Sequence, residues 1–311
     1  MSTHPTGGAR LRSLLDGGGI LLPGVANALA ARIVEDLGFD AAFVTGAGIT
    51  NTSLGLPDLG FLSLPELAAH VTAIAEATDL PLVVDADTGF GNAVTVGRTI
   101  TTLERAGAAA IQIEDQVNPK RCGHFDGQQV VPAAEMAQKI AAAADARRDD
   151  ATLIVARTDA RAAHGLGEAL DRAGVYADAG ADVLFVEGVR DRQELAAVGA
   201  TRPDVPKLAN IVEGGKTPML PRADLHRMGF AVVLYANAAL QASIQGMQDA
   251  LRRLRDDGTL AGAGDLLAPF AERQRLVGKA VFDAAEARLA ASSVPVASLV
   301  RPAAGPSARG A

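Results

Sequence analysis

The sequence predicts a (β/α)₈ barrel, a TIM-type fold in which eight parallel strands are each followed by a helix. Two observations carry this prediction. Eight short apolar segments alternate with helical segments, and polar residues follow the ends of most of the apolar segments. Continuous apolar runs are typical of strands buried on both faces, as in a parallel sheet covered by helices. An open, doubly wound sheet is the alternative, but no Gly-x-Gly-x-x-Gly motif follows the first strand.

The two kinds of segment alternate along the chain without interruption. A first helix is expected at 9–16, before the glycines at 17–19, and Pro65 suits the first turn of a later helix. The strands are expected at 20–22, 41–44, 81–84, 109–113, 152–156, 182–186, 207–209 and 231–234. The helices after them are expected at 25–37, from about 65, and at 93–106, 134–147, 168–179, 191–199, 222–228 and 239–256.

The chain beyond the eighth unit has a different character. Residues 266–289 indicate one or two more helices, with apolar side chains such as Phe270 and Phe282 that a monomeric barrel does not need. They would pack on their own barrel or on that of a neighbour. From about 291 onward Ser, Pro, Ala and Gly predominate, which predicts a flexible tail. We therefore expect one barrel domain with C-terminal helices over 1–290 and a tail over 291–311.

Composition excludes several classes of protein. The 311 residues are 49% hydrophobic and 21% charged, with a net charge of −7, which argues against a nucleic-acid or anionic-membrane partner. No apolar run approaches the ~20 residues that span a bilayer. The N-terminus lacks the basic-then-apolar pattern of a signal peptide. With a single cysteine and hence no intrachain disulfide, the sequence predicts a cytoplasmic protein.

Polar residues stand where the predicted strands end. In a (β/α)₈ barrel these ends meet on one face, where the active sites of this fold lie. The pattern therefore predicts a functional site rather than a soluble surface, which the helices already provide. The residues in this position are Thr45, Asp85, Asp87, Glu114, Arg157, Glu187 and Asn210.

Three of these residues predict a metal site. Asp85 and Asp87 are two positions apart at one strand end, and Glu114 ends the next strand. Hard cations such as Mg²⁺ prefer oxygen ligands and retain several waters, which suits such a set. An Asp-x-Asp pair alone would equally fit a solvated turn. No Cys and His in zinc spacing are present.

The other strand-end residues suit an anionic ligand. The small residues after Thr45, namely Gly46, Ala47 and Gly48, would let backbone N–H groups approach an anion. Arg157 offers two parallel donors to a carboxylate. Glu187 would orient a partner, take part in a proton path, or pair with Arg157, whereas Asn210 would contact substrate or cap its strand.

The only cysteine stands in a polar loop. Cys122 follows Lys120-Arg121 and precedes Gly123-His124, and nearby cations favour the reactive thiolate. The alternative is an incidental cysteine in a solvated loop.

Several of these motifs together resemble the isocitrate lyase/phosphoenolpyruvate mutase superfamily, and the likeness covers about residues 10–260. The string around Cys122 resembles its carbon–carbon lyases, which act on isocitrate, 2-methylisocitrate or 2,3-dimethylmalate, and also oxaloacetate hydrolases and carboxyphosphonoenolpyruvate mutase. The matching motifs are Thr45-Gly-Ala-Gly48, Leu54-Gly-Leu-Pro-Asp58, Asp85-Ala-Asp-Thr-Gly-Phe-Gly-Asn92, Glu114-Asp-Gln-Val-Asn-Pro-Lys-Arg-Cys-Gly-His124, Ala156-Arg-Thr-Asp-Ala160 and Glu213-Gly-Gly-Lys-Thr-Pro218.

The resemblance implies a (β/α)₈ barrel whose terminal helices are swapped between subunits of a homotetramer, a dimer of dimers. It also implies a site that requires Mg²⁺, with Mn²⁺ as a substitute, and a small-molecule carboxylate substrate. Asp85, Asp87 and Glu114 would bind the metal directly or through water. Asp58 would lie at the substrate and support the metal-bound waters.

The remaining roles also follow from the resemblance. Thr45, Gly46, Ala47 and Arg157 would hold the carboxylate of an α-keto acid. A gating loop that closes on substrate would carry four residues, namely Lys120, Cys122, Gly123 and His124.

The expected chemistry is cleavage of a 2-hydroxy di- or tricarboxylate between C2 and C3. This releases pyruvate or glyoxylate and leaves a carbanion, stabilised as an enediolate, that the Cys122 thiol would protonate. Gln112, Phe43 and Ala236 depart from the residues common in isocitrate and methylisocitrate lyases. These departures favour a smaller substituted malate or an oxaloacetate-like substrate. A phosphonomutase, an oxaloacetate hydrolase and a non-catalytic dicarboxylate-binding protein are the alternatives.

Overall fold

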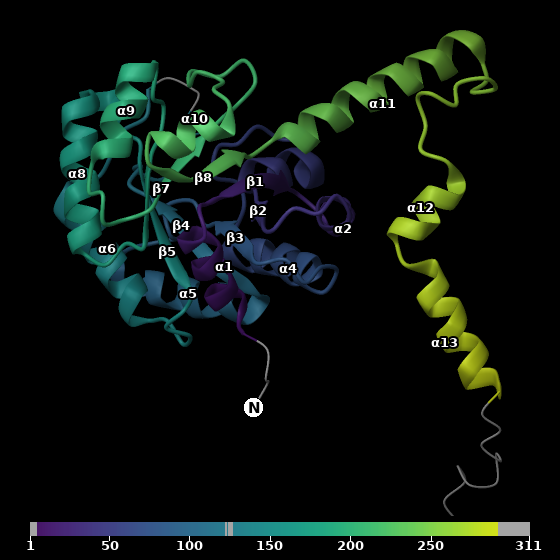
Figure 1. Ribbon diagram of the computed structural model, residues 1–311, viewed down its shortest axis with the longest axis horizontal. Helices are drawn as coiled ribbons and strands as arrows, with labels where there is room; N and C mark the ends of the chain where they lie inside the picture. The colour runs from purple at the N-terminus through teal and green to yellow at the C-terminus, as the bar shows by residue number, and fades with distance from the viewer. Residues whose placement is uncertain (1–4, 122, 124–126, 292–311) are drawn as a thin grey trace, which may run out of the picture. The chain divides into compact units, whose positions relative to one another are not determined.

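The computed structural model describes residues 5–121, 123 and 127–291. Eight parallel strands pair in sequence order, and β8 pairs with β1 to close a barrel, which confirms the (β/α)₈ prediction (Figure 1). The strands are β1 Ile20–Val25, β2 Ala42–Val44, β3 Leu82–Asp85, β4 Ala108–Glu114, β5 Leu153–Thr158, β6 Val183–Val186, β7 Lys207–Asn210 and β8 Phe230–Tyr235. The helices are α1 Gly7–Asp16, α2 Ala28–Asp36, α3 Gly46–Ile49, the π-helix η1 Thr50–Leu54, α4 Leu64–Ala75, α5 Ala93–Ala106, α6 Ala133–Asp145, α7 Ala160–His164, α8 Leu166–Asp178, α9 Arg192–Ala200, α10 Arg222–Arg227, α11 Ala238–Asp257, α12 Phe270–Leu276 and α13 Lys279–Ala291.

The first strand is longer than predicted. β1 continues through Pro23 and Gly24, and Pro23 pairs with Tyr235 of β8. A side chain on Gly24 would overlap the carbonyl oxygen of Ala236, so glycine allows the two chains to approach here. The predicted strand end at 22 and helix start at 25 are therefore wrong, and α2 begins at Ala28.

The core has two parts because successive side chains of a strand point to opposite faces. Inward-facing residues such as Leu22, Phe185 and Leu234 fill the barrel, and Leu11 and Leu15 of α1 belong to the same apolar cluster. The opposite faces of the strands form a second cluster with the surrounding helices. Burial of each large aliphatic side chain contributes roughly 1.5–3 kcal/mol, which makes these clusters the main stabilising feature.

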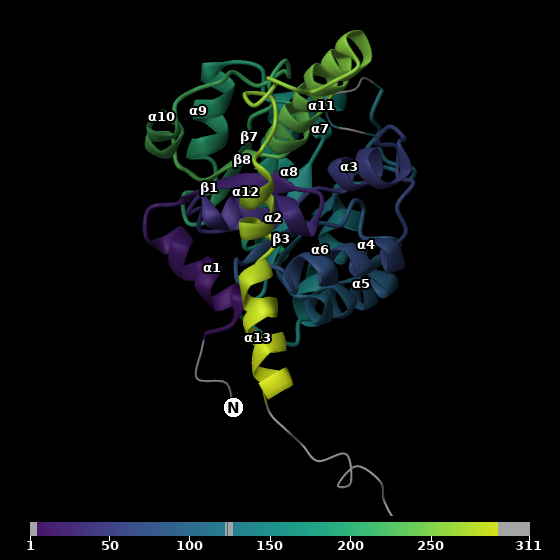
Figure 2. The ribbon, with the colours of Figure 1, turned by 90° about the vertical axis from the view of Figure 1, so that its right-hand side faces the viewer.

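Local sequence sets where the barrel helices begin. Asn92 accepts hydrogen bonds from the backbone N–H groups of Val94 and Thr95 and so caps α5, while Ser63 and Glu66 form a capping box at α4. Helices α4, α5 and α6 lie side by side on the outside of the barrel (Figures 1 and 2). Asn92 therefore has a structural role, even though it belongs to the motif that contains Asp85 and Asp87.

Three short helices were not predicted. α3 and η1 follow β2 directly, where the small residues favoured a loop because glycine has low helix propensity. The Thr45 side chain caps α3 by accepting a hydrogen bond from the N–H of Gly48. α7 follows β5 in the same way. All three occupy the ends of barrel strands, so they position residues of the candidate site.

The chain divides into two compact units, Met1–Leu266 and Leu267–Ala311. The second unit contains two helices, α12 and α13, which correspond to the helical segment predicted at 266–289 and carry exposed side chains such as Phe270 and Phe282. In the first unit α11 has no buried residue, although it carries Met247 and Leu251. No helix in the described part of the chain combines the length and apolarity needed to cross a bilayer.

Candidate active site

A cavity lies at the carboxyl ends of the barrel strands, where most of the predicted site residues meet. Its volume is about 40 Å³. Gly46 lies within van der Waals reach of Asp85 and Asp87, and Glu114 is held by Arg157. Cys122 and His124 lie outside the described residues. The predicted residues that line the cavity are Thr45, Ala47, Asp58, Asp85, Lys120, Gly123, Arg157, Glu187 and Asn210.

Asp85 and Asp87 lie beside the first turn of α3. Asp85 ends β3, and its Oδ1 accepts hydrogen bonds from Gln112 Nε2 at 3.1 Å and from the N–H of Asp87 at 3.3 Å. A Cβ atom on Gly46 would lie 3.4 Å from a carboxylate oxygen of each aspartate. The helix backbone thus approaches both acids closely because Gly46 carries no side chain.

Lys120 joins two acids from different loops. Its Nζ lies 2.5 Å from Oδ1 of Asp58 and 2.9 Å from Oδ1 of Asp87, and all three side chains are largely buried. Asp87 has φ 48°, a left-handed conformation that non-glycine residues rarely adopt. Local strain of this kind costs about 1–3 kcal/mol and is found at functional sites. The Lys120 ion pair helps to hold Asp87 in this conformation.

Burial changes the acidity of this cluster. It raises the pKa of Asp87 to about 7, against the opposing effect of the Lys120 ammonium. It also raises the pKa of Glu114 well above its usual range, although Arg157 opposes the shift. Burial alone would lower the pKa of Lys120, but the carboxylates around it, with Asp87 first, raise it overall. Lys120 therefore remains a cation, whereas the carboxyl groups of Asp87 and Glu114 bind a proton more readily than exposed carboxyl groups do.

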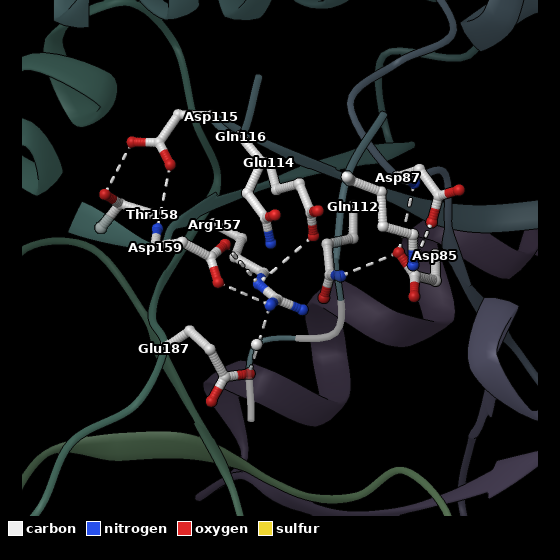
Figure 3. A network of polar contacts seen from close by, with 12 residues as sticks. Asp85, Asp87, Gln112, Glu114, Asp115, Gln116, Arg157, Thr158, Asp159 and Glu187 are labelled. Carbon is white, nitrogen blue, oxygen red and sulfur yellow. Dashed lines mark hydrogen bonds and ion pairs between the residues drawn. The ribbon is translucent and has the colours of Figure 1, made fainter. Parts of the chain in front are cut away.

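Arg157, at the carboxyl end of β5, lies among three acids (Figure 3). Its Nε and Nη2 donate to the two oxygens of Asp159 at 3.0 and 2.8 Å. Nε also lies 3.4 Å from Oε2 of Glu114, and Nη2 lies 3.7 Å from Oε2 of Glu187. Within the described chain no partner is found for Nη1. The guanidinium is therefore fixed on one side and retains donor capacity for a ligand.

Glu187 and Asn210 form a second polar pair on the cavity wall. Asn210 Nδ2 donates to Oε2 of Glu187 at 3.1 Å, and the N–H of Gly188 donates to Oε1 at 2.8 Å. The Asn210 Oδ1 atom is buried and has no hydrogen-bond partner among the described residues. A buried acceptor without a donor is costly, so this oxygen suits a ligand or a water. The predicted pairing of Glu187 with Arg157 is present, at 3.7 Å.

Thr45 supports the candidate anion site through the hydrogen bonds of its hydroxyl group. Its hydroxyl donates to Oδ1 of Asn237 at 3.2 Å and accepts from the N–H of Gly48 at 3.1 Å. The hydroxyl proton is therefore used within the protein. The first N–H groups of a helix have no partners within that helix, so Gly46 and Ala47 present the donors that an anion would use.

The described part of the loop around Cys122 lies against the cavity. The Gln116 side chain binds the backbone of Arg121 through both its oxygen and its nitrogen, at 2.9 and 2.8 Å. Gln128 Nε2 donates to the carbonyl of Gly123 at 3.0 Å. A Cβ atom on Gly123 would overlap Arg157 and Glu187. Glycine is thus required for the loop to lie this close to the two residues.

The acids fit a Mg²⁺ ion that keeps most of its waters. Oε1 of Glu114 is buried without a hydrogen-bond partner among the described residues, and carboxylate oxygens are the ligands that this ion prefers. Within the same residues, however, no group of three or more His, Cys, Asp or Glu side chains is arranged to hold a metal directly. A site with one carboxylate ligand, water and substrate oxygens needs no such group.

Two neighbours of the cavity, Gln112 and Asp159, were not among the predicted site residues, whereas Asn237 was expected either to contact substrate or to cap its strand. Gln112 lies on β4 two positions before Glu114, so both point to the same face, and its Oε1 is buried without a partner among the described residues. A glutamine within an apolar strand was the signal that could have identified it. Asp159 accepts a hydrogen bond from the Arg157 guanidinium, and Asn237 accepts one from the Thr45 hydroxyl. Only the fold revealed those contacts.

Comparison with known sequences assigns most of the chain to one family. The model of the phosphoenolpyruvate phosphomutase family matches residues 11–255. The chain is 43% identical to 2,3-dimethylmalate lyase of Eubacterium barkeri, over 87% of this chain and 93% of that protein. It is 43% identical to 2-methylisocitrate lyase of Aeropyrum pernix over 87% of each chain, and 42% identical to the carboxyvinyl-carboxyphosphonate phosphorylmutase of Arabidopsis thaliana over 86% of this chain and 79% of that one.

Solved structures of related enzymes are also similar to this chain. The crystal structure of 2,3-dimethylmalate lyase, a member of the PEP mutase/isocitrate lyase superfamily, superposes with a TM-score of 0.85 at 35% identity over 92% of this chain and 96% of that one. Oxaloacetate acetylhydrolase with the inhibitor 3,3-difluorooxalacetate gives 0.85 at 35% identity over 92% and 97%. Phosphonopyruvate hydrolase in complex with oxalate and Mg²⁺ gives 0.83 at 32% identity over 91% and 99%.

Proposed function

Since the chain belongs to the phosphoenolpyruvate phosphomutase family, within the PEP mutase/isocitrate lyase superfamily, we propose that it is a Mg²⁺-dependent carbon–carbon lyase. It cleaves a 2-hydroxy di- or tricarboxylate to pyruvate or glyoxylate and a second carboxylate. The observation that carries this proposal is the meeting of Asp85, Lys120 and Arg157 at one cavity. Oxygen ligands for a metal and two buried cations for an acidic substrate thus come together.

The chain's own residues hold the keto-acid end of the substrate. Gly46 and Ala47 donate backbone N–H groups to its carboxylate, and Arg157 adds the guanidinium side that Asp159 leaves available. Glu187, held by Asn210, orients the C2 hydroxyl and accepts its proton as the C2–C3 bond breaks.

Asp85, Asp87 and Glu114 would hold the metal, with most of its waters retained. When bound, Mg²⁺ supplies positive charge that stabilises the oxygen of the developing keto acid. Asp58 contributes through Lys120, which it fixes next to Asp87. The lysine neutralises part of the acidic cluster and so lowers the electrostatic cost of admitting an anion.

The loop of Lys120, Cys122, Gly123 and His124 acts as a lid. Breaking C2–C3 leaves the bonding electrons on C3 as an enediolate, and the Cys122 thiol returns a proton to that carbon. His124 assists from the same loop. The close approach of Gly123 to Arg157 and Glu187 supports a lid that excludes water from the carbanion.

The cavity favours a small substrate with an apolar substituent. Part of its wall is apolar, and the Arg157 guanidinium is already shared among three acids. A third substrate carboxylate would lie near Glu187 and Asp58, and among the lining residues only Arg121 adds a further cation. A substituted malate suits this wall better than a tricarboxylate does. The apolar residues that line the cavity are Phe43, Phe185, Val212, Leu234 and Ala236.

A substrate panel tests the proposal. Purified protein with Mg²⁺ and a thiol reductant is given malates with methyl substituents, isocitrate, 2-methylisocitrate and oxaloacetate, and keto acids are measured through lactate dehydrogenase. We expect keto acid from at least one substrate, and much less from a Cys122→Ser variant. If several acids bind by calorimetry and none is cleaved, the protein is a dicarboxylate-binding protein and the lyase proposal is wrong.

A phosphonate-forming mutase is the second candidate, because a carboxyvinyl-carboxyphosphonate phosphorylmutase is 42% identical to this chain. Phosphorus NMR after incubation with phosphonopyruvate or phosphoenolpyruvate separates the two candidates. Formation of a carbon–phosphorus bond from phosphoenolpyruvate, or of phosphoenolpyruvate from phosphonopyruvate, would favour the mutase. Acetate and oxalate formed from oxaloacetate would instead indicate a hydrolase, as the similarity to oxaloacetate acetylhydrolase suggests.

We further propose that the protein works in the cytoplasm as a homotetramer, a dimer of dimers. The barrel and its C-terminal helices over 1–290 act as one domain, and 291–311 are a tail. The exposed apolar residues of α11, α12 and α13 support this proposal, since such surfaces usually mark interaction sites. The terminal helices would then pack on a neighbouring subunit.

A further inference from the structure

A second buried network lies behind the cavity wall, around the acid that follows Glu114. Asp115 is fully buried, and its Oδ1 accepts from the N–H of Asp159 at 2.9 Å (Figure 3). Its Oδ2 accepts from the hydroxyls of Thr158 and Tyr176, each at 2.7 Å, and from Arg172 Nη1 at 3.1 Å. One carboxylate therefore receives four hydrogen bonds, two from α8 and two from the end of β5.

The network reaches Arg157 in two steps. The Asp159 N–H is bound by Asp115, and the Asp159 carboxylate holds the Arg157 guanidinium by two hydrogen bonds. The N–H of Asp115 also donates to the carbonyl of Arg157 at 3.2 Å. Asp115 thus fixes both the backbone of Arg157 and the residue that orients its side chain.

The same network holds the chain where the lid returns to the barrel. The N–H of Val131 donates to the carbonyl of Asp115 at 2.8 Å, and Arg172 Nη1 donates to the carbonyl of Val131, also at 2.8 Å. Val131 follows Val130, which forms a bridge with Gln116 on the other side of the lid. Movement at Asp115 would therefore shift Arg157 and the base of the lid together.

The alternative is that the network only stabilises the fold. Asp182, an acid that also receives several hydrogen bonds but lies away from the cavity, provides the comparison for that alternative. Asp182 receives hydrogen bonds from Arg12, Arg147 and the N–H of Ile154, at 2.8 to 2.9 Å. Asp182 directly precedes β6 and binds the start of β5, whereas Asp115 binds the end of β5, and none of the hydrogen-bond partners of Asp182 named above lines the cavity. A buried ion pair is weak evidence for stability as such, because apolar replacements are often as stable.

We infer that Asp115, with Arg172 and Tyr176, is a positioning cluster that holds Arg157 and the base of the lid in the geometry that substrate requires. The inference rests on the proposed function. Because Arg157 binds the substrate carboxylate before and during the reaction, a displaced Arg157 weakens the binding of substrate and transition state alike and so raises KM, whereas a shifted base of the lid lowers kcat. Simple loss of folded protein lowers apparent kcat and leaves KM unchanged.

The experiment compares Tyr176→Phe and Asp115→Asn with Asp182→Asn in the full chain. Tyr176→Phe removes one hydrogen bond without changing charge, which keeps the test valid if Asp115→Asn does not fold. We expect KM to rise about tenfold in Tyr176→Phe and more in Asp115→Asn, since a hydrogen bond to a charged group contributes on that scale. In Asp182→Asn, thermal stability falls but KM stays within about twofold of wild type.

Amide hydrogen exchange supplies a readout that needs no substrate. The Asp159 and Val131 amides are expected to exchange faster in Tyr176→Phe, and the Ile154 amide in Asp182→Asn. If wild type cleaves a substrate and Tyr176→Phe leaves KM and both amides unchanged, the inference is overturned and the proposed function stands. Equal changes in KM for Tyr176→Phe and Asp182→Asn would also overturn it. If wild type cleaves no substrate, both proposals fail.

Discussion

The Nζ atom of Lys120 lies 2.5 Å from Oδ1 of Asp58, although 62 positions separate the two residues in sequence. The same ammonium reaches Asp87 at 2.9 Å. Lys120 therefore links the loop after β4 to the loop that contains Asp58 and to the loop after β3.

Replacing Lys120 by Met should remove most of the activity. The change leaves Asp58 and Asp87 without their cation, so we expect kcat to fall about 100-fold or more, as for loss of a group that acts on protons or developing charge. Steady-state kinetics with the substrate found in the panel measures the effect. Lys207→Met removes another buried ammonium, at the start of β7, and should leave kcat unchanged. Equal losses in both variants would contradict the role of Lys120.

A single methyl group on Gly123 should impair the lid. In Gly123→Ala the new Cβ would overlap Arg157 and Glu187, so the loop cannot lie against the cavity as it does here. We expect kcat/KM to fall at least about tenfold, because small displacements of catalytic groups have effects on that scale. Thermal unfolding should change little, since the clash can be relieved by moving the loop.

Gly167→Ala is the control for that substitution. Gly167 lies in α8, and a Cβ there would meet no heavy atom within 4 Å. Alanine should slightly stabilise the helix, by up to about 1 kcal/mol, and leave kcat/KM unchanged. Wild-type kcat/KM in Gly123→Ala would show that the lid does not need this close approach.

Without metal, the protein should lose stability as pH rises from about 4 to 7. The folded-state pKa of Asp87 is about 7 and its ordinary value is 3.8, so between these values the folded state holds a proton that the unfolded state has released. Stability from this group is therefore complete below pH 4 and is lost as pH rises through 7. The slope can reach about 1.4 kcal/mol per pH unit for one proton.

Denaturant unfolding in EDTA at several pH values measures this slope. Asp87→Asn should flatten it, because the amide does not titrate. Addition of Mg²⁺ should stabilise wild type most near pH 7 and above, where the proton no longer competes for the carboxylate. A slope that is identical in wild type and Asp87→Asn would rule out Asp87 as its origin.

Charge on the exposed apolar helices should disrupt the oligomer. Leu251 of α11 is 62% exposed and Phe282 of α13 is 69% exposed. Leu251→Asp and Phe282→Asp should lower the mass measured by sedimentation to that of smaller assemblies, since a buried unpaired charge is strongly unfavourable. Glu286→Ala, on the same helix as Phe282, should leave the mass unchanged. A monomeric wild type would contradict the tetramer outright.

Much of the candidate site was predictable because it follows the strands. Asp85, Arg157 and Glu187 end or follow runs of apolar residues, and parallel strands bring such ends together. Gln112 was named only as a departure from the residues common in isocitrate and methylisocitrate lyases, because its spacing in an apolar strand does not show that its side chain binds Asp85. Asp159 was named only as part of a strand end. Its role as the partner that holds Arg157 depends on side-chain direction, which sequence spacing does not specify.

The eight βα units, the face of the barrel where the strand ends meet and the acidic set that suits a metal were predictable without the fold. Each follows from local periodicity or from the common direction of parallel strands. The contacts of Asp115, which immediately follows Glu114, became clear only from the folded chain. At a strand end two adjacent acids point to opposite faces, and closure of the barrel places one beside Arg157 and the other against α8. The same closure joins Lys120 to Asp58, since long-range contacts are set by how the whole chain packs.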